Sequence, residues 1–345
     1  KGTLMVKDSM VTIVWEMDQF HTTLHTGNSL PSIYPWFTRI NAWRDGVYNS
    51  ALAYALLGDK EAGEYGKELM VRLSTFPYWL HPWFIERGHH IYYPICEFGM
   101  DYAISYDLLY DLMDKNEKKT VRDAMMKNII LGCHKGYIED NLVTSNTSNW
   151  VAHITGGSLM CLAALYGDDP DYGSLEPYFT GAVFKDYDLI QKVFDREGAY
   201  GEGYGYYNFS MLSWSKSLPA VENVFKIDMS GKINHSYNEL IWAGIIKNKQ
   251  YFYFGDSGGD IRPLTNWAWL LPKYRDPLLG WLYNHLKEGE TFMDVLYETD
   301  DVPRHDPFGE NPVRLFPDVG TTVFKSGWEP DDFVFVMRTG AFYNH

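Results

Sequence analysis

The segment 195–209 (DREGAYGEGYGYYNF) combines glycine, tyrosine and glutamate at a density that neither a buried core nor a disordered linker would produce. Glycine adopts backbone conformations with positive φ and lets the chain approach a ligand closely. Tyrosine offers a flat apolar face for a sugar ring and a phenol that can transfer a proton. The segment therefore predicts the floor of a sugar-binding cleft. The plainer interpretation is an aromatic loop that leads into a helix.

A second segment, 144–153 (TSNTSNWVAH), changes from polar residues to a helical pattern. Asn146 or Ser148 could simply cap that helix. Asn149 and His153, however, are four residues apart, so they share one face of the first helical turn, beside the positive end of the helix dipole. An amide and an imidazole in that position could bind a carboxylate group.

Two further motifs suggest chemistry that their surroundings do not favour. Gly255–Gly259 (GDSGG) matches the string around the nucleophile of chymotrypsin-like proteases, but that fold is all-β and this segment lies among predicted helices, so a helix-entry turn is the simpler interpretation. Glu86–His90 contains two adjacent histidines, which point to opposite sides of an extended chain. No HExxH pattern occurs. We therefore predict a substrate-facing loop there and no metal site. The cysteines are predicted to be buried thiols: Cys96, Cys133 and Cys161.

Composition and charge restrict the class of partner. The chain has 345 residues, 46% of them hydrophobic and 17% aromatic, with 26 Tyr and 12 Trp. Its net charge of −15 argues against nucleic acid, which needs a basic surface. An anionic polysaccharide still fits, because a cleft can be locally positive. Basic residues of the aromatic-rich half that could line such a cleft are Arg44, Arg87, His89, His90 and His153. No run of about 18 apolar residues predicts a membrane span.

Residues from about 35 to 297 show a succession of helical patterns. Two of these helices end alike, at Gly58-Asp59 and at Gly167-Asp168, which indicates a repeated helical hairpin. Such hairpins bury their apolar faces as a superhelix or as a closed α/α toroid, and the toroid fits better because its loops line a cleft. The predicted helices are 42–57, 61–73, 92–113, 117–130 capped by Asp114, 149–166, 209–225, 237–247, 263–271 and 278–287.

The composition changes after about Val302. Residues 313–326 are rich in β-forming residues, 327–332 form a turn pattern, and 333–338 form a second strand pattern. Two or three strands are not stable alone, so they either pack on the helices or belong to a larger sheet domain, which we favour. The chain is thus predicted to be mainly α, with an incomplete (α/α) toroid over 1–302 and the first strands of an antiparallel β-sandwich over 303–345.

These segments together resemble the heparinase II/III-like polysaccharide lyases. The resemblance covers most of the chain and depends on the order and spacing of motifs, none of which is decisive alone. The matching residues are Arg44 with Ala51–Asp59; Ser148–Trp150 with Gly156-Gly157; Asp195, Gly198, Glu202-Gly203 and Tyr206-Tyr207; Phe254–Ser257; and Phe316–Gly320 with Lys325–Trp328.

The resemblance implies an α/α toroid followed by an antiparallel β-sandwich, and β-elimination at uronic acids by a periplasmic or secreted enzyme. The family's sandwich carries a His-rich motif soon after its second strand, and this sequence stops at Tyr343-Asn344-His345, where that motif begins. The family's divalent metal, zinc or calcium, would then be bound beyond residue 345. No cofactor is expected within the chain itself.

β-Elimination removes the C5 proton of a uronate, which becomes more acidic when the adjacent carboxylate is neutralised by hydrogen bonds. A base takes this proton and an acid protonates the leaving O4. By position in the family pattern, Tyr207 would be the acid/base, with Tyr206 as the alternative register. Its pKa of about 10 would have to fall, which a nearby imidazolium or Arg could cause.

Other roles follow from the same resemblance. Asn149 would neutralise the substrate carboxylate, assisted by His153, and His345 would close the site from the β domain. The family often has His where this chain has Asn149 or Trp150, so syn and anti elimination both stay open. The residues expected to bind substrate are Trp150, Glu202, Tyr204, Arg44, Arg87, His89 and His90.

Two other functions compete with the lyase. An α/α-toroid glycoside hydrolase would use two carboxylates, Glu202 with Asp195 or Glu197. A glycan-binding protein would need the aromatic faces but no acid or base. The sequence does not distinguish heparan sulfate, hyaluronan, alginate, ulvan or other uronic-acid glycans, and it predicts neither endo or exo action nor the oligomeric state.

Overall fold

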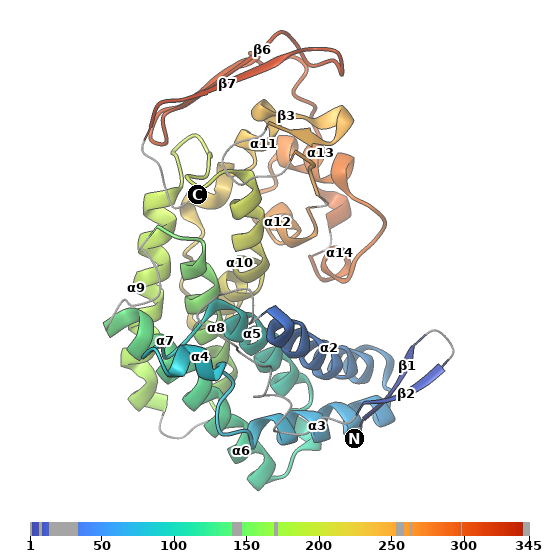
Figure 1. Ribbon diagram of the computed structural model, residues 1–345. Helices are drawn as coiled ribbons and strands as arrows, with labels where there is room; N and C mark the ends of the chain where they lie inside the picture. Colours follow the sequence, from blue (N-terminus) through green and yellow to red (C-terminus); the bar gives the residue numbers. More distant parts are fainter. Residues whose placement is uncertain are drawn as a thin grey trace. The chain divides into compact units, whose positions relative to one another are not determined.

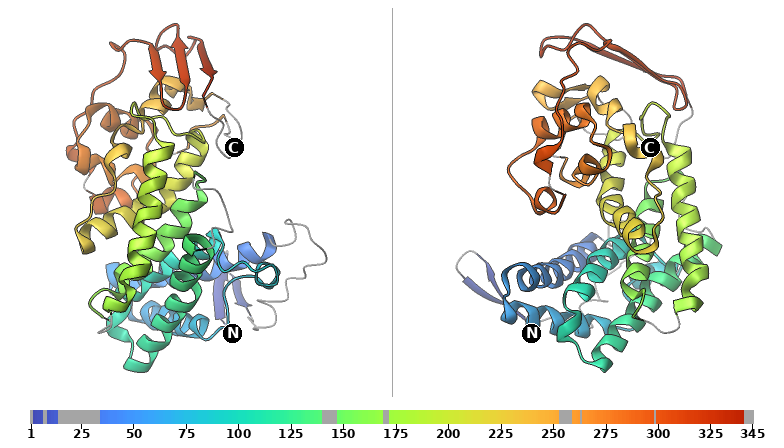
Figure 2. Two further views of the ribbon diagram at one scale, coloured as in Figure 1. Left: turned by 90° about the vertical axis from the view of Figure 1, so that its left-hand side faces the viewer. Right: turned by 180° about the vertical axis from the view of Figure 1, so that it is seen from behind.

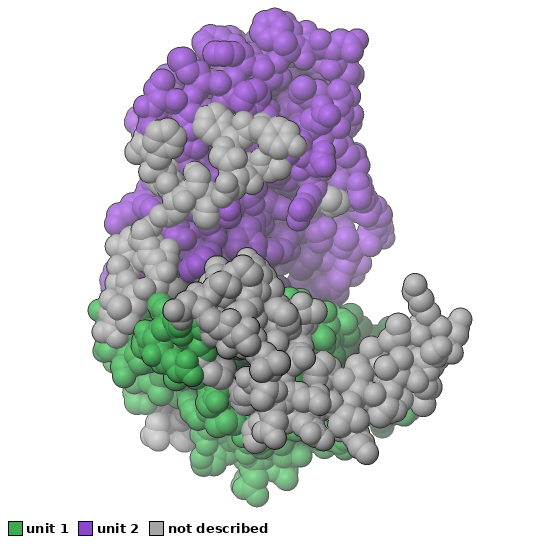
Figure 3. Space-filling view, viewed as in Figure 1, with its two compact units in different colours: residues 1–143, 160–178 green, residues 144–159, 179–345 purple. Residues whose placement is uncertain are grey.

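The computed structural model describes residues 2–6, 9–13, 34–139, 147–168, 172–252, 259–262, 264–297 and 299–340. The chain divides into two compact units (Figure 3). Unit 1 contains residues 1–143 and 160–178, and unit 2 contains residues 144–159 and 179–345. The described residues are mainly helical with small antiparallel sheets, which confirms the predicted fold class at that level.

Unit 1 consists of an N-terminal β-hairpin and a series of helices. The hairpin pairs β1 (Gly2–Val6) with β2 (Ser9–Ile13) and was not predicted. The helices confirm the four predicted between residues 42 and 130. They are α2 (Tyr34–Leu57), α3 (Lys60–Ser74), α4 (Pro82–Ile85), α5 (Tyr93–Leu108), α6 (Lys115–Met125), the π-helical turn Met126–Ile130, α7 (Leu131–Cys133) and the π-helical turn His134–Glu139.

Neighbouring helices of unit 1 pack with alternating directions. Helix α2 packs on α3 and α5, and α3 packs on α6. Gly46 of α2 lies against Leu69 and Gly66 of α3 lies against Ser50, so α2 and α3 are antiparallel. The Tyr102 hydroxyl of α5 donates to the Met70 carbonyl of α3, 2.6 Å away, while Leu109 lies near Gly66, so α5 is also antiparallel to α3. Helices α2 and α5 are therefore parallel neighbours, as expected for a repeated hairpin.

The two similar helix ends share a backbone conformation. Gly58 after α2 and Gly167 after α8 have φ of 70° and 84°, the left-handed region that glycine adopts without strain. The aspartates that follow differ. Asp59 caps α3, whereas Asp168 accepts hydrogen bonds from two tyrosine hydroxyls of unit 1 and pairs with Arg122. The repeat therefore extends to the turn but not to the chemistry of its aspartate.

Unit 2 contains the long helix α10, most of the long helices α8 and α9, and several short helices (Figure 1). The first ten residues of α8 (Trp150–Leu165) belong to unit 2 and the rest to unit 1. The other helices are α9 (Glu176–Val193), whose first three residues belong to unit 1, α10 (Tyr204–Phe225), α11 (Asn238–Ala243), α12 (Leu270–Tyr274), α13 (Pro277–Leu286) and α14 (Phe292–Tyr297). Short 3₁₀ turns in the two units are Tyr110–Leu112, Tyr172–Leu175, Gly231–His235, Ile246–Asn248, Thr265–Trp267 and Thr299–Asp301.

Several helix boundaries differ from the prediction. The helix predicted over 209–225 begins at Tyr204, because Gly203 with φ of 82° ends the loop and Gly205 is tolerated in the first turn. The helix predicted over 237–247 ends at Ala243, where strand β3 begins. The prediction over 263–271 is largely wrong, since α12 begins only at Leu270. Helix α9 was not predicted, and its early Pro177 fits a first helical turn.

Two small sheets complete unit 2. β3 (Gly244–Ile245) pairs with β4 (Gln250–Tyr251). The C-terminal sheet has the antiparallel order β5 (Val313–Phe316), β6 (Thr321–Lys325) and β7 (Val334–Arg338), and Figure 2 shows these strands side by side. The stretch predicted as β-rich over 313–326 is thus two strands, separated by a turn in which Gly320 has φ of 66°.

The three-stranded sheet has one covered face and one exposed face. On the covered face the buried Lys325 donates to the carbonyls of Ile241 and Gly244 at the end of α11, at 2.8 and 2.7 Å. The opposite face carries apolar side chains that are 39–55% exposed: Val313, Leu315, Phe324, Phe335 and Met337. The strands therefore pack on the helical part through one face, and a second sheet of the expected sandwich stays a prediction.

Candidate active site at the start of helices α8 and α10

Helices α8 and α10 run side by side in the same direction. His153 of α8 shares a hydrogen bond between Nδ1 and Ser213 Oγ of α10, 2.7 Å long, and its ring lies 4.0 Å from that of Phe209. One turn later, Gly156 lies against Ser213 and Ser217, where an added Cβ would be 3.3 Å from Ser217 Oγ. Residues later in α8 contact residues later in α10, so the two helices are parallel. Their N-termini therefore lie at the same end of the α8–α10 interface, which we call the seam.

Glu202 lies where the two helices begin and is 3% exposed. Its Oε2 accepts hydrogen bonds from the backbone N of Asn149 at 2.7 Å and from Asn149 Nδ2 at 3.1 Å, with the Tyr200 hydroxyl at 3.4 Å. The positive ends of two helix dipoles favour a negative charge at this point. Glu202 was expected to bind substrate, but here its carboxylate holds the side chain of Asn149.

This contact fixes the orientation of the Asn149 amide. Nδ2 must face the carboxylate, because Oδ1 in its place would set two acceptors against each other. The fully buried Oδ1 then has no hydrogen-bond partner among the described residues. The preceding Ser148 accepts a hydrogen bond from Trp150 N at 3.3 Å, which confirms Ser148 as a capping residue of α8. Trp150 is half-buried.

Tyr206 and Tyr207 face different neighbours although they are adjacent in sequence. Tyr206 precedes Ser213 by seven residues, two helical turns, so it lies on the same face of α10 as the contacts with α8. It is half-buried. Its level on α10 matches the level of Asn149 on α8, since Asn149 precedes His153 by one turn and His153 contacts Phe209 and Ser213.

Tyr207 belongs to an aromatic core. It is 1% exposed, its ring lies 4.9 Å from that of Trp267 and 5.4 Å from that of Phe194, and its hydroxyl shares a hydrogen bond with Ser236. Burial raises the pKa of Tyr207 above its usual range, and the bond with Ser236 opposes this shift only in part. This is the opposite of the fall that a general base would need. Burial likewise raises the pKa of Tyr204, whose hydroxyl donates to the Arg262 carbonyl at 3.4 Å.

His153 is a neutral imidazole. It is fully buried, and burial, together with the charge of Lys216, lowers its pKa to about 3. It therefore supplies no positive charge that could lower the pKa of a tyrosine. Its hydrogen bond to Ser213 instead holds α8 against α10.

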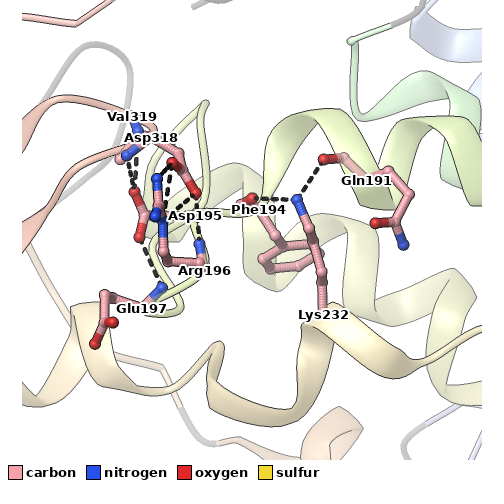
Figure 4. A network of polar contacts seen from close by, with 8 residues as sticks. All are labelled: Gln191, Phe194, Asp195, Arg196, Glu197, Lys232, Asp318 and Val319. Carbon is pink, nitrogen blue, oxygen red and sulfur yellow. Dashed lines mark hydrogen bonds and ion pairs between the residues drawn. The ribbon is translucent and has the colours of Figure 1, made fainter.

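The carboxylates considered for a hydrolase are bound to other groups of the chain. Asp195 is fully buried, with Oδ1 accepting from Glu197 N at 2.7 Å and Oδ2 accepting from Asp318 N at 2.5 Å and Val319 N at 3.0 Å (Figure 4). Glu197 pairs with Arg314 at 2.6 Å. Together with the contact between Glu202 and Asn149, these bonds give each of the three carboxylates a partner within the chain.

The sequence did not reveal two charged residues that hold the loop before α10. Glu239 of α11 accepts from Tyr200 N at 3.0 Å, and Arg338 of β7 donates to the Gly201 carbonyl. Burial raises the pKa of Glu239. A glutamate inside the apolar run of α11 (NELIWA) was a signal of such a buried partner. The sequence held no comparable signal for Arg338, which is distant in sequence from the loop.

The predicted basic residues of unit 1 have local partners. Arg44 pairs with Asp101 at 3.4 Å, and the guanidinium of Arg87 lies 4.1 Å from the centre of the Trp83 ring. His89 and His90 are half-buried, and burial, with the charges of Arg87 and His90, lowers the pKa of His89. The role of these residues in substrate binding stays a prediction.

Some expectations fall outside the described residues. His345 and most of the Gly255–Gly259 motif belong to segments that the structure does not describe. Within the ranges that it does describe, no group of three or more His, Cys, Asp or Glu could hold a metal ion, and no helix is long and apolar enough to cross a membrane. Cys96, Cys133 and Cys161 are buried, as predicted.

No protein-family model matches the sequence, and the search of curated proteins finds no match. The choice of function therefore depends on the residues at the start of α8 and α10.

Proposed function

We propose that the chain is a polysaccharide lyase that cleaves a uronic-acid-containing glycan by β-elimination. The observation that carries the proposal is the oriented amide of Asn149, held by buried Glu202 on the seam that also carries Tyr206. An amide at the positive end of a helix can donate a hydrogen bond to a uronate carboxylate, and a phenol can transfer the C5 and O4 protons.

Tyr206 is the proposed acid/base, in place of Tyr207. Tyr206 lies on the α8-facing side of α10 at the level of Asn149, whereas Tyr207 is enclosed by aromatic rings with a raised pKa. Asn149 neutralises the substrate carboxylate through the second N–H of Nδ2, since the first donates to Glu202. His153, being neutral, keeps the two helices together.

The binding of Asp195 and Glu202 to backbone and amide N–H groups favours elimination over hydrolysis. A general acid of a glycosidase must carry a proton and be free to give it to the leaving oxygen. Asp195 and Glu202 instead accept hydrogen bonds from N–H groups of the chain, which favours a positioning role for both carboxylates. The same bonds do not exclude a glycan-binding protein, which the assay below separates.

The finer architecture is part of the proposal. Helices α2 and α5 of unit 1 are parallel to each other, and so are α8 and α10 of unit 2. Parallel helices of this kind form the layers of an α/α toroid. The exposed apolar face of β5–β7 is what one sheet of a β-sandwich would present. The resemblance to the heparinase II/III-like lyases supports both and implies a periplasmic or secreted enzyme acting on an anionic polysaccharide.

The test is a panel of heparan sulfate, hyaluronan, alginate and ulvan, monitored for near-ultraviolet absorbance of a 4,5-unsaturated uronate. Tyr206→Phe is expected to lower kcat by at least about 100-fold while substrate affinity is kept, because acid–base catalysis contributes about that much. Tyr207→Phe is the matched control, which should alter kcat less than about threefold and lower stability by about 1 kcal/mol through the lost bond to Ser236.

Other outcomes would assign another function. New reducing ends without absorbance would indicate a hydrolase, and binding without turnover in every variant would indicate a glycan-binding protein. Loss of turnover in Tyr207→Phe but not in Tyr206→Phe would assign the acid/base role to Tyr207.

A further inference from the structure

The loop 195–202, which leads from α9 to α10, is held by the strands β5–β7. Figure 4 shows the first contact, in which the Asp195 carboxylate binds the backbone N–H groups of Asp318 and Val319 in the turn between β5 and β6. Lys232 donates to the Gln191 carbonyl at 2.7 Å and so fixes the end of α9 just before this loop. The start of the loop is therefore anchored on both sides.

The far end of the loop has its own anchor on the sheet. Arg338 at the end of β7 donates to the Gly201 carbonyl, one residue before Glu202. Between the two ends, Arg314 of β5 pairs with Glu197. Arg314 and Arg338 alternate along their strands with the exposed Val313 and Met337, so both arginines lie on the covered face of the sheet.

The Asp195 contact is the strongest of these anchors on physical grounds. A buried carboxylate that accepts three N–H bonds forms charge-assisted hydrogen bonds, and its loss leaves buried donors unsatisfied. The neighbouring ion pair between Arg196 and Asp318 is largely exposed, and exposed pairs contribute little. The two contacts lie side by side in Figure 4, which makes Arg196 a matched control for Asp195.

We infer that the sheet β5–β7 is a positioning device for the site, acting through Asp195 and Arg338. By fixing loop 195–202, these positioning residues place Glu202 so that it orients the amide of Asn149, and they set the point where α10 and Tyr206 begin. The consequence for turnover rests on the proposed function. The placement of Glu202 has a readout of its own, because Asn149 N donates to its carboxylate.

The test compares Asp195→Asn with Arg196→Ala by hydrogen exchange and kinetics. In Asp195→Asn the amides of Gly201 and Asn149 are expected to exchange at least about tenfold faster, while those of α13 are unchanged. The kcat for unsaturated product should fall at least about tenfold with KM within about threefold, since small misplacements of catalytic groups cost this much. Arg196→Ala keeps the bond from Arg196 N to Asp318 and should change neither quantity more than about twofold.

Arg338→Gln repeats the test from the β7 end and replaces Asp195→Asn if that variant does not fold. Unchanged exchange at Asn149 together with unchanged kcat would overturn the inference. Faster exchange along the whole chain, α13 included, would also overturn it, because it would show a general loss of stability. If the wild-type protein forms no unsaturated product but exchange at Asn149 still rises in the variant, the positioning holds and the lyase proposal fails.

Discussion

In the proposed function, the buried Glu202 serves catalysis without transferring a proton, because it orients the amide of Asn149. The carboxylate holds Nδ2 of the amide toward itself, so in the proposed function the second N–H of Nδ2 is the donor to the substrate, and two helix N-termini favour the negative charge of Glu202. The amide therefore meets a ligand in one orientation only. Such preorganisation costs nothing at the moment of reaction.

Asn149→Ala should separate this catalytic role from stability. The backbone N of Asn149 still donates to Glu202, so we expect a loss of only about 1 kcal/mol in the free energy of unfolding. The kcat should fall at least about 100-fold, because the substrate carboxylate is no longer neutralised. Ser148→Ala, which removes the cap of α8, should lower stability by about 1 kcal/mol at unchanged kcat. Thermal denaturation and the absorbance assay measure both, and equal loss of activity in the two variants would contradict the role.

Asp186 predicts a pH dependence of stability. This carboxyl of α9 is fully buried and accepts from Trp214 Nε1 of α10 at 3.0 Å; burial raises its pKa from 3.8 to about 7. Between these values the folded protein holds a proton that the unfolded chain has lost. The contribution of Asp186 to stability therefore falls as pH rises from about 4 to 7, by at most about 1.4 kcal/mol per unit, and is constant above.

Asp186→Asn removes this titration and is the variant that tests it. Its stability relative to the wild type should increase from pH 5 to pH 8 in urea unfolding experiments. A constant difference between the two proteins over this range would show that Asp186 does not titrate there.

The sequence predicted the α8 residues of the candidate site better than those of α10. Asn149 and His153 were placed on one helical face from their spacing; His153 contacts Ser213 of α10, and Asn149 contacts Glu202 in the loop before α10. The sequence favoured Tyr207 as the acid/base, with Tyr206 as the alternative, and these adjacent helical residues differ by about 100° in direction. The start of α10 at Tyr204, which the glycines of the loop concealed, places Tyr207 among aromatic rings and Tyr206 on the side of the contacts with α8.

At the scale of elements, the loop 195–202 has a shape that only glycine permits at one point. Gly198 has φ of 100°, and a Cβ added there would lie 1.7 Å from the carbonyl oxygen of His235. The backbone of 235–236 therefore occupies the space of a side chain. Asn238 of α11 also donates to the Glu197 carbonyl at 3.0 Å.

Gly198→Ala should consequently be severe, with a loss of more than about 4 kcal/mol in the free energy of unfolding or no folded protein. Gly58→Ala is the matched control, with φ of 70° but no atom within 4 Å of the added Cβ, and should cost about 1–2 kcal/mol. Urea unfolding measures both. Similar losses would mean that the loop moves aside easily.

Helices with clear end signals were the predictable elements. Asp114 forms a full capping box with Glu117, and Asp59 caps α3, and the starts of α3 and α6 lie within two residues of the predicted ones. Helix α11 and strand β3 could not be separated in this way. Their boundary at Gly244 is set by tertiary contacts, because its carbonyl accepts from Lys325 of β6.

At the scale of the molecule, the open face of β5–β7 should govern solution behaviour. Paired positions such as Phe324 and Phe335 give it a continuous apolar surface across the strands. A surface of this kind drives association with other apolar surfaces. The 345-residue chain is therefore expected to self-associate with increasing concentration.

Phe335→Lys should shift this equilibrium toward the monomer in sedimentation experiments without lowering stability by more than about 1 kcal/mol, because the side chain is 52% exposed. Tyr166→Lys, a change of an exposed aromatic residue of unit 1, is the control and should leave association unchanged. A wild-type chain that stays monomeric at all concentrations would contradict the prediction.

The anchoring of loop 195–202 also has a consequence for biosynthesis. The backbone N–H groups that bind Asp195 lie 123 and 124 residues later in the chain. Helices α8, α9 and α10 therefore leave the ribosome long before the strands that hold the loop between α9 and α10. A nascent chain can form these helices early, since the backbone hydrogen bonds within each helix are local, but the bonds that hold the loop form only after β5–β7 have been made. Competence for chemistry would then arise as one of the last events of folding, after most of the helical framework is already in place.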